Sequence, residues 1–92
     1  MWKVYWSKSV EKDLNKIPKF ILEKLQAWIL AVEKDGMQKV RMSKGYHDEP
    51  LRGKRIGQRS IRLNRCYRAI YLEKADGHIY IAEIIEVNKH EY

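Results

Sequence analysis

The sequence predicts an α+β fold in which a helical hairpin packs on a mainly antiparallel sheet. A short β-rich segment is followed by two stretches with helical spacing, and then by three β-rich segments separated by turn residues. The predicted order of elements is therefore β-α-α-β-β-β, within one domain that spans residues 1–92. A chain of 92 residues with 45% hydrophobic content has the size and composition of one packed globular unit.

The first 36 residues predict one strand and two helices. Residues 2–6 are aromatic or β-branched at alternate positions, which is typical of a strand. Ser7 or Ser9 can cap the first helix, Pro18 fits the first turn of the second, and Gly36 stands where the second helix would end. The apolar residues at helical spacing are Val10, Leu14 and Ile17, then Ile21, Leu25, Trp28, Ile29 and Val32.

The stretch from Met37 to Gln58 has no clear period and is interrupted by glycines and Pro50. We expect a long loop here, with a short strand near Val40. Loops of this length in compact domains are often functional.

Three strands are predicted after this loop, at Arg59–Leu63, Tyr67–Glu73 and Ile79–Val87. Asn64-Arg65 makes the first turn, and Asp76-Gly77 is a strong hairpin signal. The last strand is apolar on both faces for much of its length, as expected of a strand in the centre of a sheet.

Positive charge is concentrated in one block of the chain. Between Lys39 and Arg68 there are ten cationic residues and two acids, Asp48 and Glu49, whereas the formal charge of the whole chain is +7. A local cationic surface is typical of a protein that binds a polyanion, which favours a nucleic-acid role.

The composition also indicates in which cellular compartment the protein acts and whether it binds a cofactor. Cys66 is the only cysteine, so no internal disulfide can form and a reducing cytoplasm is expected. No apolar run is long enough to span a membrane. The three histidines have no recurring spacing, and we expect neither a metal nor another cofactor.

Glu49 and Arg68 are the first candidates for chemistry. Glu49 either neutralises neighbouring arginines or acts as a general base, whereas Asp48 beside it is expected to lie at the surface. Arg68 falls in the middle of a predicted strand. It either pairs with an acid such as Glu83 or Glu86, or faces a functional groove.

The C-terminal residues His90 and Tyr92 are the second pair of candidates. They either form a solvated tail or supply an acid near neutral pH. His47 is a weaker catalytic candidate, as a loop neighbour of the cationic block.

Together these residues match the needs of RNA cleavage without a metal. A base takes the proton of a 2′-hydroxyl, cations stabilise the phosphate as charge develops, and an acid protonates the departing 5′-oxygen. Glu49, the cations, and His90 or Tyr92 can fill these roles, and the 2′-hydroxyl makes the substrate RNA. The residues expected to bind RNA are Arg52, Lys54, Arg55, Arg59, Arg62 and Arg65.

Four short motifs, in this order and spacing, resemble the RelE/ParE superfamily of toxins from bacterial toxin–antitoxin pairs. They are Glu49-Pro50-Leu51-Arg52-Gly53, Gly57-x-x-Ser60, Tyr67-Arg68-Ala69-Ile70-Tyr71 and His90-x-Tyr92. The first is especially similar to the YoeB branch. The resemblance spans essentially the whole chain.

The resemblance implies a RelE-like fold and a ribosome-dependent mRNA endonuclease, held inactive by an antitoxin. It implies that Glu49 is the general base and Arg68 the phosphate-stabilising arginine, with His90 and Tyr92 as the C-terminal acid and the orienting aromatic. This chain departs from YoeB-like members because Glu91 separates His90 from Tyr92.

Two other functions stay open on the sequence. A ParE-like toxin shares the fold but inhibits DNA gyrase and cuts nothing. A non-catalytic RNA- or ribosome-binding module would need only the cationic block, and neither Glu49 nor His90.

Overall fold

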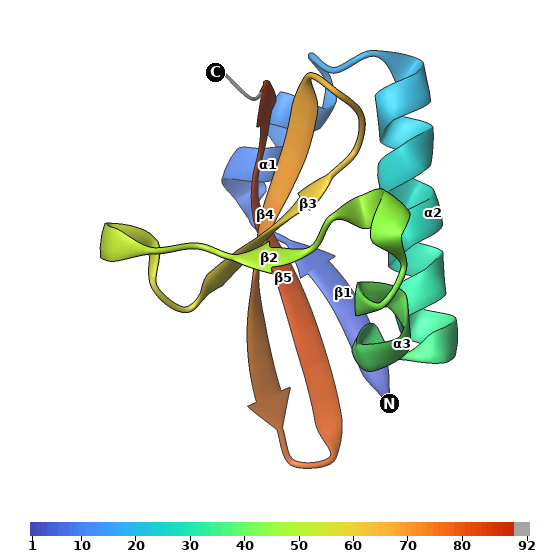
Figure 1. Cartoon of the computed structure of the whole chain (residues 1–92), viewed down its shortest axis with the longest axis vertical. Coiled ribbons are helices and arrows are strands. Elements are labelled where there is room, and N and C mark those ends of the chain that lie inside the picture. The colour runs from blue at the N-terminus through green and yellow to red at the C-terminus, as the bar shows by residue number, and fades with distance from the viewer. Residues whose placement is uncertain (90–92) are drawn as a thin grey trace.

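The computed structural model describes residues 1–89, in which a five-stranded sheet has the strand order β1-β5-β4-β3-β2 (Figure 1). Strand β1 runs parallel to β5, and the other neighbouring pairs are antiparallel. The predicted α+β fold is therefore confirmed. The elements are β1 (Trp2–Trp6), α1 (Lys8–Leu14), α2 (Lys19–Asp35), α3 (Met37–Arg41), η1 (Lys44–Tyr46), β2 (Glu49–Pro50), η2 (Gly53–Arg55), β3 (Gln58–Arg62), β4 (Tyr67–Asp76) and β5 (Ile79–Lys89).

The two main helices begin and end close to the predicted positions. Pro18 immediately precedes α2, where its missing N–H costs no hydrogen bond. The predicted strand near Val40 is wrong, because residues 37–41 form the short helix α3. Met37 and Val40 stand three residues apart on one side of this helix, and both are buried. One turn of helix is too short for its period to be recognised in the sequence.

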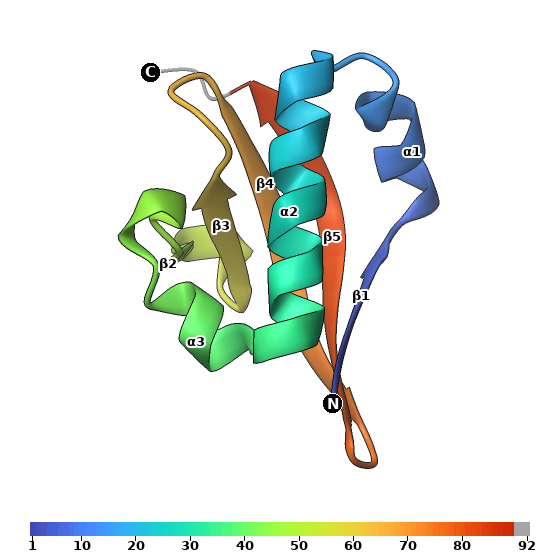
Figure 2. The same cartoon turned by 90° about the vertical axis from the view of Figure 1, so that its right-hand side faces the viewer.

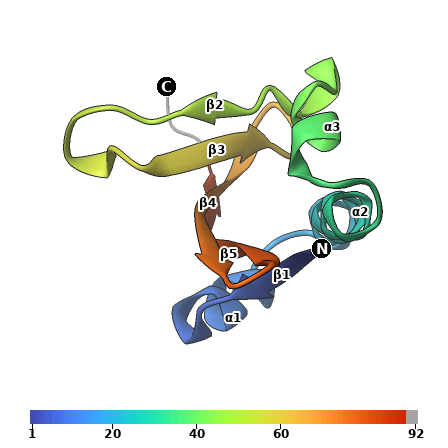
Figure 3. The same cartoon turned by 90° about the horizontal axis from the view of Figure 1, so that it is seen from below.

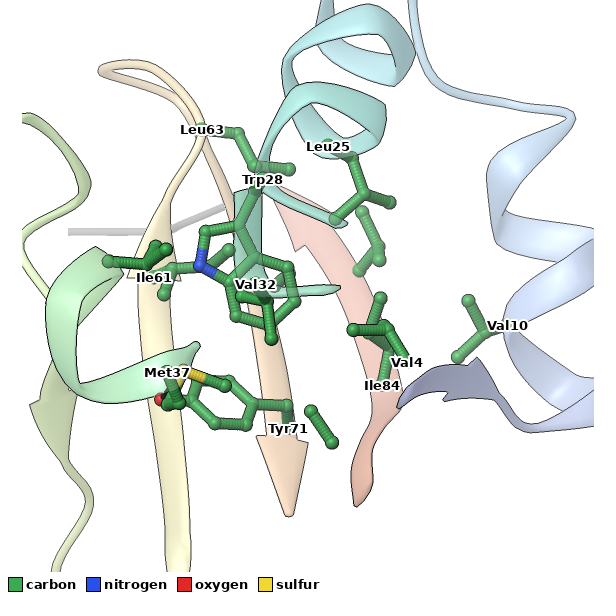
Figure 4. Close-up of a cluster of buried hydrophobic side chains, with 14 of the residues drawn as sticks. Val4, Val10, Leu25, Trp28, Val32, Met37, Ile61, Leu63, Tyr71 and Ile84 are labelled. Carbon is green, nitrogen blue, oxygen red and sulfur yellow. Dashed lines mark hydrogen bonds between the residues drawn. The ribbon is translucent and has the colours of Figure 1, made fainter. Parts of the chain in front are cut away.

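The core lies between α2 and the face of the sheet that α2 covers (Figure 2). Trp28 and Tyr71 are fully buried and contact each other, with ring centroids 5.1 Å apart (Figure 4). Helix α1 packs against β5 and adds Val10 to the same cluster. Each large apolar side chain removed from water here stabilises the fold by about 1.5–3 kcal/mol.

The sheet has a second face, opposite α2, which we call the open face. Ala69 and Tyr71 of β4 belong to the core, so the alternation of side chains turns Arg68 and Ile70 to the open face. Residues 51–57, which we call the arm, connect β2 to β3 and project on the side of the sheet away from α2 (Figures 1 and 3).

A β-bulge in β5 decides which residues of this strand reach the open face. Ile70 pairs with Glu86 but Tyr71 pairs with Ile84, so Ile85 is an extra residue. The bulge allows both Ile84 and Val87 to be buried in the core, although they are three residues apart. Beyond the bulge, Glu86 and Asn88 lie beside Ile70 and Arg68.

No helix among residues 1–89 has the length and apolar character needed to cross a membrane.

Gly36, between α2 and α3, has a backbone conformation that only glycine adopts readily, with φ 89° and ψ 152°. We predict that Gly36→Ala lowers the free energy of unfolding by about 1–3 kcal/mol through backbone strain. A Cβ here would meet Trp2 at an ordinary distance of 3.7 Å, so steric overlap adds little. Urea unfolding measures the change.

Gly45→Ala is the matched control, because its φ is not positive and a Cβ there meets nothing within 4 Å. It should leave stability unchanged or raise it by up to about 1 kcal/mol. Equal losses from the two substitutions would contradict the role given to the Gly36 backbone.

Candidate active site on the open face

A pocket on the open face brings together five of the residues predicted from the sequence: His47, Glu49, Arg62, Arg65 and Arg68. Strand β2 supplies Glu49, β3 supplies Arg62 and β4 supplies Arg68. The register explains the grouping, because Glu49 pairs with Ser60 and Arg62 pairs with Arg68. The other residues lining the pocket are Ser60, Ile61, Asn64 and Tyr67.

Glu49 presents an exposed carboxylate to this pocket. Its side chain is 59% exposed, and its Oε2 lies 3.8 Å from Nε2 of His47. His47 has a left-handed backbone, with φ 50°, at the end of the short helix η1. This local turn lets the imidazole and the carboxylate, two residues apart, lie beside each other.

Arg68 is not paired with either acid that the sequence suggested. Glu83 accepts a hydrogen bond from Lys74 at 2.7 Å, and Glu86 is bound by Arg55 at 3.0 Å. Within residues 1–89, Arg68 makes one side-chain hydrogen bond, from Nε to Oδ1 of Asn88 at 3.5 Å. Its terminal guanidinium nitrogens therefore have no partner among the described residues.

Arg62 and Arg65 add positive charge around Arg68. Arg62 is the direct cross-strand neighbour of Arg68, an arrangement in which like charges repel each other. Arg65 lies in the turn between β3 and β4, where Oδ1 of Asn64 accepts hydrogen bonds from the backbone N–H groups of Cys66 and Tyr67, each at 2.8 Å. An anion bound in the pocket would relieve the repulsion.

The expectation that Asp48 lies at the surface is wrong. Its side chain is only 1% exposed, and Oδ1 accepts a 2.7 Å hydrogen bond from Nε of Arg59. Nε of Arg41 is 3.7 Å from the same oxygen, and Tyr71 donates a hydrogen bond to Oδ2. The sequence could not separate the two neighbouring acids, because the groups that bury Asp48 come from three different elements.

This cluster shifts the pKa values of two of its members. Burial, followed by the hydrogen bond to Asp48, raises the pKa of Tyr71 to about 12. Burial alone would lower the pKa of Arg59, but its hydrogen bond and charge interaction with Asp48 outweigh that effect and raise the pKa. Both shifts favour a neutral phenol and a charged guanidinium around the Asp48 carboxylate.

Four of the residues expected to bind RNA lie away from the pocket. Arg52 and Lys54 are exposed on the arm, whereas Arg55 is bound to Glu86 and Arg59 to Asp48. His90 and Tyr92, expected to supply the acid, lie outside the described residues. Lys89, the last described residue, pairs with Tyr67 at the edge of the pocket.

Asn88 is a site residue that the sequence analysis missed. It follows Val87 near the end of a strand that looks apolar on both faces, and the bulge at Ile85 changes which residues share a face. Asn88 could have been recognised as a polar residue directly opposite Arg68, but only if the register of β4 and β5 had been known.

A second, wider cleft lies at the far end of the sheet, near Trp2 and Tyr80. Its cations are already paired, Arg41 with Glu73 and Lys74 with Glu83. Among residues 1–89, no group of three or more His, Cys, Asp or Glu side chains is placed to hold a metal ion. The pocket on the open face is therefore the better candidate for chemistry on an anion.

The fold is similar to that of solved toxin structures, in agreement with the RelE-like fold that the resemblance implied. A YoeB/ParE toxin from Agrobacterium tumefaciens is similar over 97% of this chain and 99% of that chain, with 22% identity and a TM-score of 0.74. YafQ from E. coli is similar over 98% and 94%, with 14% identity and a TM-score of 0.70. The toxin–antitoxin complex RelBE2 from Mycobacterium tuberculosis matches over 96% of each chain, with 20% identity and a TM-score of 0.67.

Comparison of the sequence with protein-family models and with curated proteins gives no match. At the identities found among solved structures, the likeness concerns the fold.

We predict that Asp48→Asn lowers the free energy of unfolding by about 2 kcal/mol, because it takes the charged hydrogen-bond acceptor away from the partly buried Arg59 and from Tyr71. Glu49→Gln is the matched control, with the same chemical change one residue further at an exposed position. It should change stability by less than about 0.5 kcal/mol. Urea unfolding of the two variants distinguishes them, and equal stability would contradict the anchoring role of Asp48.

Tyr71 should make stability depend on alkaline pH. Its pKa is raised from 10.0 to about 12 in the fold, so its contribution is present below pH 10 and is lost as pH rises from 10 towards 12. We predict that Tyr71→Phe is less stable than the parent at neutral pH and that the difference shrinks above pH 10. Urea unfolding at several pH values measures it, and a constant difference would show that Tyr71 does not titrate this way.

Proposed function

We propose that this chain is the toxin of a type II toxin–antitoxin system and acts in the cytoplasm as a ribosome-dependent mRNA endonuclease. The observation that carries the proposal is the shared pocket, in which an exposed carboxylate, Glu49, faces the cations Arg62, Arg65 and Arg68. The likeness of the fold to solved toxins supports the toxin role.

Glu49 acts as the general base in this proposal. It takes the proton of a ribose 2′-hydroxyl, whose oxygen then attacks the adjacent phosphorus. The exposure of Glu49 leaves room for a substrate hydroxyl, and its neighbour His47 can accept the proton or hold the carboxylate in place.

Arg68 stabilises the phosphate as negative charge grows on its non-bridging oxygens, with Arg62 and Arg65 adding to the local positive potential. The bond from phosphorus to the 5′-oxygen then breaks, and His90 or Tyr92 donates a proton to that oxygen. The products carry a 2′,3′-cyclic phosphate and a 5′-hydroxyl. This chemistry uses no metal, and it requires RNA because DNA lacks the nucleophile.

Arg52 and Lys54 on the arm extend the cationic surface beyond the pocket. We expect them to contact the RNA backbone of mRNA or of the ribosome, through contacts that do not depend on sequence. RelBE2 and the YoeB–YefM pair from Staphylococcus aureus were solved as complexes. A cognate antitoxin that binds this chain and silences it is accordingly part of the proposal.

We predict that induced expression without an antitoxin arrests growth and cleaves translated mRNA. Primer extension maps the cuts, and end-labelling identifies the expected 5′-hydroxyl. Glu49→Gln should reduce the cleavage rate by about 10²–10⁴-fold, the usual contribution of a general base. Asp76→Asn is the control, since it removes an exposed carboxylate at the far end of β4 and should leave cleavage unchanged.

Two outcomes would overturn the proposal in different directions. Intact mRNA together with trapped gyrase–DNA complexes would assign the chain a ParE-like activity. Growth arrest that persists at full strength in Glu49→Gln, without mRNA cleavage, would point to a binding module that blocks translation.

A further inference from the structure

A chain of polar contacts links the arm to Arg68 across the open face. Nη2 of Arg55, on the arm, donates to both carboxylate oxygens of Glu86 at 3.0 and 3.2 Å. Nδ2 of Asn88 donates to Oε2 of Glu86 at 2.7 Å, and Oδ1 of Asn88 accepts from Nε of Arg68 at 3.5 Å. Nη1 of Arg55 also donates a 2.8 Å hydrogen bond to Oε1 of Gln58, the first residue of β3, so the Arg55 side chain is held by two partners.

Glu86 lies where it could neutralise Arg68. Arg68 pairs with Asn88 in the register of β4 and β5, so Glu86 is its diagonal neighbour two residues along β5 on the same face. Diagonal neighbours on one face of a sheet are within reach of long side chains. An acid and an arginine so placed would pair, unless each is held by another group.

The observed contacts keep the two apart. Arg55 and Asn88 occupy the Glu86 carboxylate, and the neutral amide of Asn88 is the group that meets Arg68. Arg55 and Glu86 are 40% and 31% exposed, a setting in which an ion pair contributes little to stability. Their contact therefore matters for where charge is placed more than for folding.

We propose that Arg55 and Asn88 are positioning residues that hold Glu86 away from Arg68 and so keep the Arg68 guanidinium free for a phosphate. The sequence suggested Arg55 as an RNA contact, but here its charge is used within the protein. The inference rests on the proposed function only in taking a phosphodiester as the natural ligand of Arg68. It adds that the arm and the phosphate site depend on each other.

The test is a double-mutant cycle read by NMR, with inorganic phosphate as the probe. The Nε–H resonance of Arg68, assigned by its loss in Arg68→Lys, reports phosphate binding directly. Arg55→Gln should weaken the phosphate affinity of Arg68 roughly fivefold, the effect of one partly exposed ion pair. In a Glu86→Gln background the same substitution should have no more effect than the loss of one arm charge.

Three further variants complete the test. Arg52→Gln removes the same charge from the arm without touching Glu86, and measures the effect of charge alone. Asn88→Asp puts a carboxylate against Arg68 and should weaken phosphate binding even when Arg55 is present. Arg55→Lys keeps a cation beside Glu86 and should retain most of the affinity.

Equal effects of Arg55→Gln with and without Glu86→Gln would overturn the inference and leave Arg55 as a direct ligand-binding cation. The measurement does not require RNA cleavage. A chain that cuts no mRNA but shows the coupling would refute the proposed function alone, whereas a chain that cuts mRNA without the coupling would refute this inference alone.

Discussion

The arrangement of the open face depends on the burial of one carboxylate, Asp48, among Arg59, Arg41 and Tyr71. A buried charge without partners is strongly unfavourable, so the loop before β2 closes properly only when α3, β3 and β4 are all in place. Successive side chains of an extended backbone point in opposite directions. Holding Asp48 inward therefore turns Glu49 outward, and a structural ion cluster thereby sets the orientation of the proposed base.

Seven of the ten cations in the block that dominates the sequence fall into three groups in the fold. Arg41 and Arg59 are partly buried and neutralise the buried Asp48. Arg62, Arg65 and Arg68 gather at the pocket, where repulsion among them can be relieved by an anion. Arg52 and Lys54 stay exposed on the arm. The net charge of the block thus overstates the number of cations available to a polyanion. Arg41 and Arg59 are paired with Asp48, and Arg55 is paired with Glu86.

Local patterns were sufficient for most of the fold, because helix stripes, the Asp76-Gly77 turn and the alternation in β3 and β4 are properties of short segments. They failed where structure depends on distant partners. Helix α3 is too short to show a period in the sequence. Its two buried residues, Met37 and Val40, can be recognised as core residues only once α3 is packed against α2. Asp48 and Glu49 look alike locally, yet they have opposite environments. The sequence named Glu49, Arg62, Arg65 and Arg68 as candidates, and the fold places them around one pocket, whereas Asn88 could be found only with the register of β4 and β5.

Because Ile85 is an extra residue, the side chains of β5 alternate between the two faces of the sheet in one order before it and in the opposite order after it. Before it, the core positions are Ala82 and Ile84; after it, the core position is Val87, and the polar residues Glu86 and Asn88 take the other side. When this chain is compared with other proteins of the fold, equivalents of Glu86 and Asn88 must therefore be counted back from the end of the strand. Counting forward from Ile84 would assign them to the wrong face and hide the polar pair beside Arg68.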